Sequence, residues 1–295
     1  MHVHLSLTLP FPASIFVLTL SGIQPLSLHS GTVLLPDKNL LALLGTNGLT
    51  EAERYWIPFL DDPSCTLNPV HCAMEGHLRR FPTEAEFRDE WRLAAQKLRQ
   101  HLPRATLVSE WEQSYPIARD LTFRIEAEGK FLVAVSPLLA HQVARRNLRS
   151  VEASIFELAK LHDLQGGGLV TLAALACLYE QGTKNVPPPA RGVLKPGPGY
   201  SESDAHNAIL DIKALEFLLV AASFGLPPIG FLTRDKSLGR LWRNLQARPQ
   251  TALQGKARAY FQLSERLFPR IDDNGVKRIR AALEAIDSPS PDKRT

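Results

Sequence analysis

The chain has 295 residues, 44% of them hydrophobic and 22% charged, and this balance excludes a disordered or a fibrous protein. Its length is sufficient for one large α/β domain or for a domain with an appendage. Lys and Arg outnumber Asp and Glu by 34 to 30, which permits a polyanionic partner without requiring one.

Cysteine usage and the N-terminal segment indicate a cytoplasmic protein. Cys65, Cys72 and Cys177 are odd in number and lack CxxC spacing, so we expect neither a disulfide framework nor a zinc site. The first 30 residues contain no Lys or Arg, and Pro10 and Pro12 interrupt their apolar run, which argues against a targeting segment. No run of 18 or more apolar residues occurs, so no membrane span is expected.

The N-terminal third predicts strands followed by a strand that runs into a helix. Residues 2–9 alternate between polar and apolar, and residues 16–20 suggest a second strand, so residues 1–30 are expected to form an N-terminal β extension. The short apolar run from Gly31 ends in Asp37 and opens directly into the apolar residues 39–44. This texture is typical of a buried strand leading into a helix.

The middle of the chain predicts a largely helical insertion over about residues 82–165. Helical periodicity covers 68–80 and 83–101, and the second of these opens with a capping-box arrangement. Alternation over 120–136 around a Glu-Gly pair predicts a hairpin, and 137–164 returns to helical periodicity.

The last part of the chain is expected to add another strand to the sheet, with helices on either side of it. Residues 186–199 contain two Pro-rich runs and are expected to form a loop. A long helix over 203–224, a buried strand over 229–233 and a helix over 236–247 follow. The expected class is α/β, a doubly wound and mainly parallel sheet flanked by helices. We place the core domain at 31–245, a C-terminal helical segment at 246–287 and a polar disordered tail at 288–295.

Acidic residues follow two of the predicted core strands. Asp37 ends the first strand and Asp235 lies just beyond the strand at 229–233. The carboxyl ends of parallel strands converge on one crevice, so these acids are expected to be neighbours there. Grouped carboxylates are the ligands that Mg²⁺ and Mn²⁺ prefer. The alternative for each acid is an N-cap of the helix that follows it, a role that Asp favours in any protein.

A third group of polar residues lies on the predicted helix over 203–224. Asp204, Asn207 and Asp211 are spaced by three and four residues, which places them on one side of that helix. Asp211 lies beside the buried stripe rather than opposite it, whereas Asp204 has the alternative of an N-cap. We expect the carboxylates of Asp37, Asp211 and Asp235 to line one cleft, where like charges raise the pKa of at least one of them.

Two residues compete to supply a fourth acid. Glu75 follows apolar positions at helical spacing and precedes Gly76, which allows another backbone to approach closely. Glu152 lies at the margin of the apolar face of a later helix. The geometry of the apolar faces weighs equally for the two residues, so Glu152 stays open as the alternative to Glu75.

Four stretches together resemble the PIN or PIN-like nuclease family. They are Val33–Leu41 with its acid and asparagine, Ala73–Gly76, the helical run Asn207–Leu218, and Phe231–Leu238 with its Thr and Asp. The resemblance covers about residues 31–245, although the interval between the second and third acids is far longer than in compact members. It implies a Mg²⁺- or Mn²⁺-dependent ribonuclease whose catalytic and metal-binding residues are Asp37, Glu75, Asp211 and Asp235.

The resemblance also suggests supporting roles. Residues that would orient the ligands are Asn39, Asp204, Asn207 and Thr233, and residues that would contact RNA are Lys38, Arg191, Lys195, Arg234 and Lys236. The main alternative is a catalytically inactive PIN-like domain that binds RNA or assembles with protein. A nucleotide-binding switch is disfavoured because no GxGxxG or P-loop sequence occurs. The sequence leaves open whether the chain forms a homo-oligomer or binds an inhibitor protein.

Overall fold

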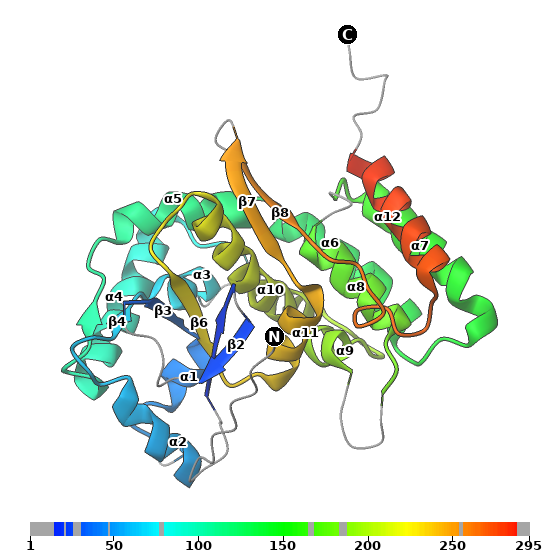
Figure 1. Ribbon diagram of the computed structural model, residues 1–295. Helices are drawn as coiled ribbons and strands as arrows, with labels where there is room; N and C mark the ends of the chain where they lie inside the picture. The colour runs from blue at the N-terminus through cyan, green and yellow to red at the C-terminus, as the bar shows by residue number, and fades with distance from the viewer. Residues whose placement is uncertain are drawn as a thin grey trace, which may run out of the picture.

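The computed structural model describes residues 15–20, 22–25, 31–46, 48–76, 80–164, 168–182, 188–253 and 256–287. It is an α/β structure in which a six-stranded, mostly parallel sheet is flanked by helices (Figure 1). The α/β class predicted from the sequence is therefore confirmed, and the strand arrangement is compatible with a doubly wound fold.

The central sheet has the order β2-β1-β6-β3-β4-β5. Its strands, in chain order, are β1 (Phe16–Thr19), β2 (Gly22–Pro25), β3 (Val33–Pro36), β4 (Thr66–Leu67), β5 (Thr106–Leu107) and β6 (Ile229–Thr233). Strand β3 runs parallel to β6 and β4, and β4 runs parallel to β5, whereas β1 is antiparallel to β2 and β6. In the β3–β6 register Pro36 lies opposite Leu232, so the residues that follow the two strands begin side by side.

This topology corrects the predicted N-terminal boundary. Residues 1–30 were expected to form an N-terminal β extension ahead of the core domain at 31–245, but β1 pairs with β6 inside the central sheet. Val17 and Leu18 are fully buried there, since both faces of the strand are covered. The expected strand over 2–9 lies outside the described residues, as does the tail at 288–295.

The helices between β3 and the glycine run form the predicted helical insertion and the elements that precede it. They are α1 (Lys38–Leu43), α2 (Glu51–Trp56), the 3₁₀ helix η2 (Ile57–Phe59), α3 (Val70–Glu75), α4 (Glu84–His101), α5 (Trp111–Thr122), α6 (Ile125–Leu139), the 3₁₀ helix η3 (Arg145–Asn147) and α7 (Leu148–Leu161). The capping box predicted at the start of α4 is present, with the Thr83 side chain accepting from Glu86 and the Glu86 carboxylate accepting from Thr83.

The hairpin predicted over 120–136 is wrong, because this segment contains the end of α5 and most of α6. Ile125, Phe131, Leu132 and Val135 are buried at helical spacing on α6. Packing against the neighbouring helices thus outweighs the local alternation, and Gly129 is tolerated inside the helix at a modest cost in stability.

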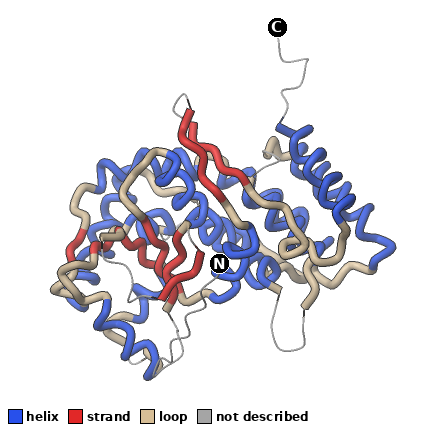
Figure 2. The backbone as a smooth tube through the Cα atoms, in the orientation of Figure 1, coloured by secondary structure: helices blue, strands red, loops and turns tan. Residues whose placement is uncertain are grey.

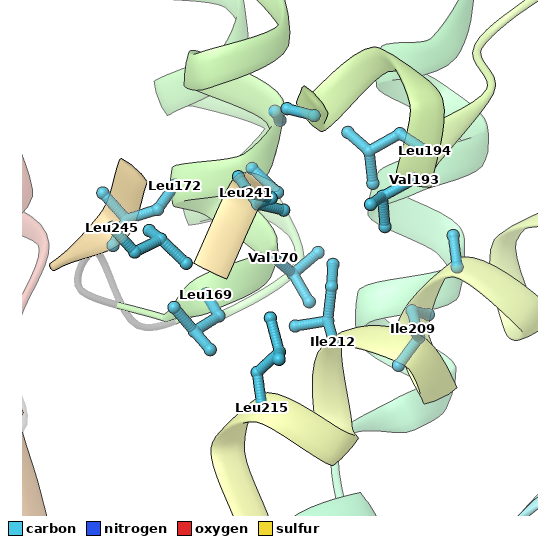
Figure 3. Packing of buried hydrophobic residues seen from close by; sticks show 14 of the residues in the cluster. Leu169, Val170, Leu172, Val193, Leu194, Ile209, Ile212, Leu215, Leu241 and Leu245 are labelled. Carbon is cyan, nitrogen blue, oxygen red and sulfur yellow. The ribbon is translucent and has the colours of Figure 1, made fainter. Parts of the chain in front are cut away.

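The helices around the second half of the core are α8 (Leu169–Tyr179), α9 (Pro189–Leu194), α10 (Glu202–Ser223) and α11 (Lys236–Leu245). Figure 3 shows their apolar side chains meeting in one layer, with Val193 of α9, Ile212 of α10 and Leu241 of α11 turned toward Val170 of α8. The long central helix α10 is buried along most of its length, so whatever it carries is held rigidly against the sheet.

Two further expectations are corrected in this half of the chain. Residues 186–199 were expected to be a loop, yet residues 189–194 form α9. Pro189 occupies the first turn, where the missing N–H costs nothing, and Lys195 ends the helix in the left-handed conformation (φ 49°). Residues 183–187 lie outside the described part of the chain.

The segment 246–287 is not wholly helical. It begins with a hairpin, β7 (Arg248–Leu253) and β8 (Lys256–Tyr260), and only then forms α12 (Asp273–Asp287). Figure 2 shows this two-stranded ribbon standing apart from the strands of the central sheet. Pro249 and the Gln254-Gly255 pair disfavour a continuous helix here. None of the helices in the described part of the chain combines the length and apolar character needed to cross a membrane.

Candidate functional site

Asp37 lies directly after β3 and is buried, with 3% of its surface exposed. One carboxylate oxygen, Oδ1, accepts the backbone N–H of Asn39 at 2.8 Å and thereby caps α1. The other, Oδ2, accepts the hydroxyl of Thr233 at 3.0 Å. Burial raises the pKa of Asp37, and nearby His71 opposes this effect. Asp37 is therefore both a helix cap and a group turned toward the end of β6.

The end of β6 joins Asp37 to Asp235. The buried hydroxyl of Thr233 donates to Asp37 and accepts the backbone N–H of Asp235 at 3.0 Å. Asp235 Oδ1 in turn accepts the N–H groups of Ser237 at 2.6 Å and Leu238 at 2.9 Å, which caps α11. Asp37 and Asp235 therefore both cap helices, as the N-cap interpretation expects, and Thr233 links the two residues through hydrogen bonds.

Helix α3 contributes Glu75 together with a histidine that the sequence analysis missed. His71 is 1% exposed, and its Nδ1 lies 3.2 Å from Oε1 of Glu75 while its Nε2 lies 3.2 Å from the carbonyl oxygen of Leu210. Burial disfavours a charged His71, but Glu75 and Asp37 outweigh burial, so its pKa is raised. The spacing of four residues between His71 and Glu75 was the available signal, because residues so spaced face the same side of a helix.

Asp211, on α10, is the acid with the strongest perturbation. Burial raises its pKa to about 8, and the negative charges of Asp37, Asp235 and Glu75 act in the same direction, with His71 opposing. Within the described residues no hydrogen bond reaches its carboxylate. The neighbouring acids thus act in the direction expected from the sequence, although burial is the larger cause. We refer to Asp37, Glu75, Asp211 and Asp235 as the acid cluster.

Glu152, the alternative second acid, belongs to a different part of the structure. Its carboxylate accepts Arg278 Nε at 2.9 Å and Nη2 at 2.8 Å, and it also accepts the hydroxyl of Tyr179. These contacts join α7, α8 and α12, and Glu152 is absent from the principal charges acting on Asp211. Of the two competing residues, Glu75 is the one whose charge acts on Asp37 and Asp211.

The residues expected to orient the ligands differ in what they contribute. Thr233 bridges Asp37 and Asp235, whereas Asn39 contacts Asp37 through its backbone N–H and has an exposed side chain. Asp204 is exposed and accepts the Ser201 N–H and hydroxyl in a capping box at the start of α10. Asn207 is exposed, and among the described residues no hydrogen bond links its side chain to an acid.

The cations expected to contact RNA are also placed differently. Lys38 Nζ donates to the carbonyl of Gly76 and ties α1 to the end of α3. Arg234 forms an ion pair with buried Glu53 of α2. Of the remaining three, Arg191 is half-buried and its Nη1 donates to the Leu139 carbonyl at 2.7 Å at the end of α6, whereas Lys195 and Lys236 are exposed.

The acid cluster matches a hard divalent cation in chemistry but not yet in arrangement. Four carboxyl groups supply the oxygen ligands that Mg²⁺ and Mn²⁺ prefer, and no described group forms a hydrogen bond that would stabilise the charged form of Asp211. Over the described ranges, however, no group of three or more His, Cys, Asp or Glu side chains is close enough together to hold an ion. Holding one would require the acidic side chains to move closer.

Comparison with known proteins gave no match to a family model, to a curated protein or to a solved structure. The function is therefore inferred from the acid cluster itself.

Proposed function

We propose that the protein is a metal-dependent ribonuclease whose acid cluster holds Mg²⁺ or Mn²⁺. The observation that carries this proposal is Asp211, a carboxylate on a rigid buried helix whose pKa is raised to about 8 by burial and by three neighbouring acids. A carboxyl group whose charged form is disfavoured this strongly is typical of a functional site. A divalent cation is the partner that would stabilise the charged form.

Each residue of the site has a defined part in this proposal. Asp37, Glu75, Asp211 and Asp235 would hold the ion, and a bound divalent ion supplies neutralisation of the charge at a scissile phosphate. Thr233 positions the carboxylate of Asp37 and the backbone of Asp235 through its two hydrogen bonds. His71 holds Glu75 against α10 by contacting both Glu75 and the Leu210 carbonyl. RNA as the polynucleotide, and hydrolysis as the reaction, come from the resemblance to PIN-like nucleases.

A second candidate is an inactive domain of the same fold that binds RNA or protein. The observation in its favour is that Asp37 and Asp235 already serve as helix caps, a role that explains an Asp at each position without any chemistry. The described residues also contain no three acids in position to hold an ion. This candidate differs from the nuclease in one respect that can be measured: divalent ions would change neither activity nor stability.

The test is cleavage of a mixed RNA pool with Mn²⁺ or Mg²⁺ by the purified protein and by Asp37→Asn and Asp211→Asn variants. We expect each variant to lose about 1,000-fold in rate, since a ligand of a catalytic ion contributes several kcal/mol. Asp120→Asn is the matched control, because Asp120 is 78% exposed on α5 and undergoes the same isosteric change.

A second measurement separates metal binding from catalysis. Mn²⁺ should raise the unfolding temperature of the wild type and of Asp120→Asn but not of Asp211→Asn, because a ligand that binds only the folded state stabilises it. Cleavage that is equal in the wild type and both site variants would show that the acid cluster is not the nuclease centre. No cleavage and no Mn²⁺ stabilisation would favour the inactive domain.

A further inference from the structure

One face of α11 carries three cations and no acid. Lys236 and Arg243 are exposed and Arg240 is partly exposed, and the helix contains no Asp or Glu. At 100° per residue, these three positions fall within an arc of about 60° and span about 10 Å along the helix axis. We call Lys236, Arg240 and Arg243 the basic face of α11.

The cations of the basic face do not contribute polar contacts to the fold. Within the part of the chain that the structure describes, none of the three forms a hydrogen bond or an ion pair. This distinguishes them from Arg234, which is paired with Glu53, and from Arg191, which is bound to carbonyls at the end of α6. Three like charges on one side of a helix repel one another, so their grouping costs stability unless a polyanion binds there.

The opposite side of α11 fixes the orientation of the basic face. Leu238, Leu241, Trp242 and Leu245 are buried, and Figure 3 shows Leu241 and Leu245 turned into the layer formed with α8 and α10. The indole Nε1 of Trp242 donates to the carbonyl of Thr19 at 2.6 Å, which fastens the helix to β1. The apolar side of α11 is therefore buried in the core, and the cations lie on the opposite side of a rigidly packed helix.

The position of α11 connects the basic face to the acid cluster. Asp235, a member of the cluster, is the N-cap of α11, and Lys236 is its first residue. The row of cations begins beside the acids and continues along the helix away from them. In Figure 1, α11 begins at the edge of the sheet where β6 ends. A polyanion lying on the basic face would thus pass next to the acid cluster.

We propose that the basic face of α11 binds the phosphodiester backbone of the RNA substrate and leads it to the acid cluster. The nature of the polyanion rests on the proposed function. A backbone contact is favoured over an anionic membrane surface because no large apolar side chain of α11 is exposed between the cations, as insertion into a lipid interface requires. Contacts of this kind hold the strand without reading its sequence.

The test is binding of a labelled oligouridine of about 20 nucleotides in EDTA, so that binding is measured without metal or cleavage. The variant is Lys236→Gln, Arg240→Gln, Arg243→Gln, because Gln keeps a good helix propensity. Its matched control is Arg145→Gln, Arg146→Gln, Arg149→Gln on η3 and α7, three exposed cations whose loss lowers the net charge of +4 equally. Circular dichroism and thermal unfolding establish that both variants are folded.

We expect the α11 variant to bind about 100-fold more weakly at about 0.1 M salt, and the slope of log K against log salt to fall by about 2, which corresponds to three lost contacts with a single strand. The control should lose less than about 5-fold through the general change in net charge. An equal or larger loss in the control would overturn the proposal, as would an unchanged salt slope or a greater loss of binding to anionic phosphatidylserine vesicles than to RNA. Because metal is absent, RNA binding that depends on α11 in a protein that cleaves nothing would sustain this proposal while refuting the nuclease.

Discussion

Helix α10 carries two ionisable residues, Asp211 and Lys213, that lie only two residues apart in sequence and differ in the partners that the chain supplies to them. Lys213, 3% exposed, donates to the carboxylate of Glu128 at 2.7 Å and to that of Glu216 at 2.8 Å. Each of these acids therefore has a cationic hydrogen-bond partner. Asp211 has none among the described residues, and the charges that act on it most are those of three acids and His71.

The difference distinguishes acids that stabilise the fold from acids that do not. A buried carboxylate costs several kcal/mol unless a partner replaces its hydration. Around Lys213 the partner is part of the chain, and the group joins α6 to α10. Around Asp211 the chain supplies three more acids, which His71 opposes, and no hydrogen-bond partner, so the missing partner is expected to come from outside. Both groups lie on the same rigid helix, which makes flexibility of the backbone a poor explanation for the contrast.

The largest expected effect follows from removing the cation of the compensated group. Lys213→Met leaves the carboxylate of Glu128 buried without its partner, and we expect the free energy of unfolding to fall by about 3 to 5 kcal/mol. Urea denaturation at pH 7 measures this loss. Because a carboxylate with a raised pKa destabilises the fold as pH rises, the loss should be larger at pH 8 than at pH 5.

Combining Lys213→Met with Glu128→Gln should restore stability, because it removes the buried carboxylate that has lost its partner. The double variant should recover a substantial part of the lost stability, since the neutral amide is cheaper to bury than a carboxylate. If Lys213→Met changes stability by less than about 1 kcal/mol, the compensated group contributes little and the contrast with Asp211 loses its basis.

The uncompensated group should respond in the opposite direction. Asp211→Asn removes a charge that the folded protein disfavours, so we expect the metal-free protein to become more stable by about 1 to 3 kcal/mol at pH 8. The same variant is expected to lose nuclease activity and Mn²⁺ stabilisation. A stability gain with a loss of function is the combination that an architectural acid would not give.

The pH dependence sharpens this contrast. The pKa of Asp211 is raised from 3.8 to about 8 in the folded state, so between these values the folded protein holds a proton that the unfolded chain has released. The stabilisation is fully present below about pH 4 and is lost as pH rises through about 8. Burial raises the pKa of Glu180 to about 7 and contributes in the same direction.

The measurement is the free energy of unfolding of metal-free wild type and Asp211→Asn at several pH values between 5 and 9. The difference between the two proteins isolates Asp211 from Glu180, which is present in both. We expect the difference in unfolding free energy, in favour of Asp211→Asn over the wild type, to increase as pH rises. A constant difference over this range would mean that Asp211 ionises normally in the folded protein.

Much of the fold could be predicted from the sequence because its signals are local. The apolar run before Asp37, the strand before Asp235 and the amphipathic pattern around Asp211 each specify one element, and those elements are β3, β6 and α10. Predictions failed where distant packing decides the structure. Alternation over 120–136 gave way to burial of one face of α6, and the ribbon of β7 and β8 was taken for helix.

Contacts in the site also divide into those that local sequence signals predict and those that depend on distant packing. The approach of Thr233 to Asp37 follows from the register of two parallel strands, which the motifs at their ends allowed us to anticipate. The partner of Arg191 lies on α6, 52 residues earlier in the chain, and no local pattern indicates it. His71 was missed because a lone histidine among apolar residues is usually assigned to the core, and only the placement of Glu75 and Leu210 around it reveals its part in the site.

The smallest expected effect tests whether Thr233 serves the acid cluster or only the end of β6. Thr233→Val keeps the shape of the side chain but removes the hydroxyl that donates to Asp37 and accepts from the Asp235 N–H. Leaving a buried acceptor and a backbone donor without a partner should cost about 1 to 2 kcal/mol of unfolding free energy. Thr233→Ser is the control, because it loses a methyl group and retains the hydroxyl.

The two values to compare for each Thr233 variant are its unfolding free energy and its affinity for Mn²⁺. A residue that orients a metal ligand typically contributes about 10-fold or more to affinity, so Thr233→Val should weaken Mn²⁺ binding by at least that factor while Thr233→Ser stays close to the wild type. Calorimetric titration with Mn²⁺ on folded protein measures this directly. If Thr233→Val loses stability but binds Mn²⁺ as the wild type does, the hydroxyl only completes the two helix caps, and Asp37 needs no such support to hold an ion.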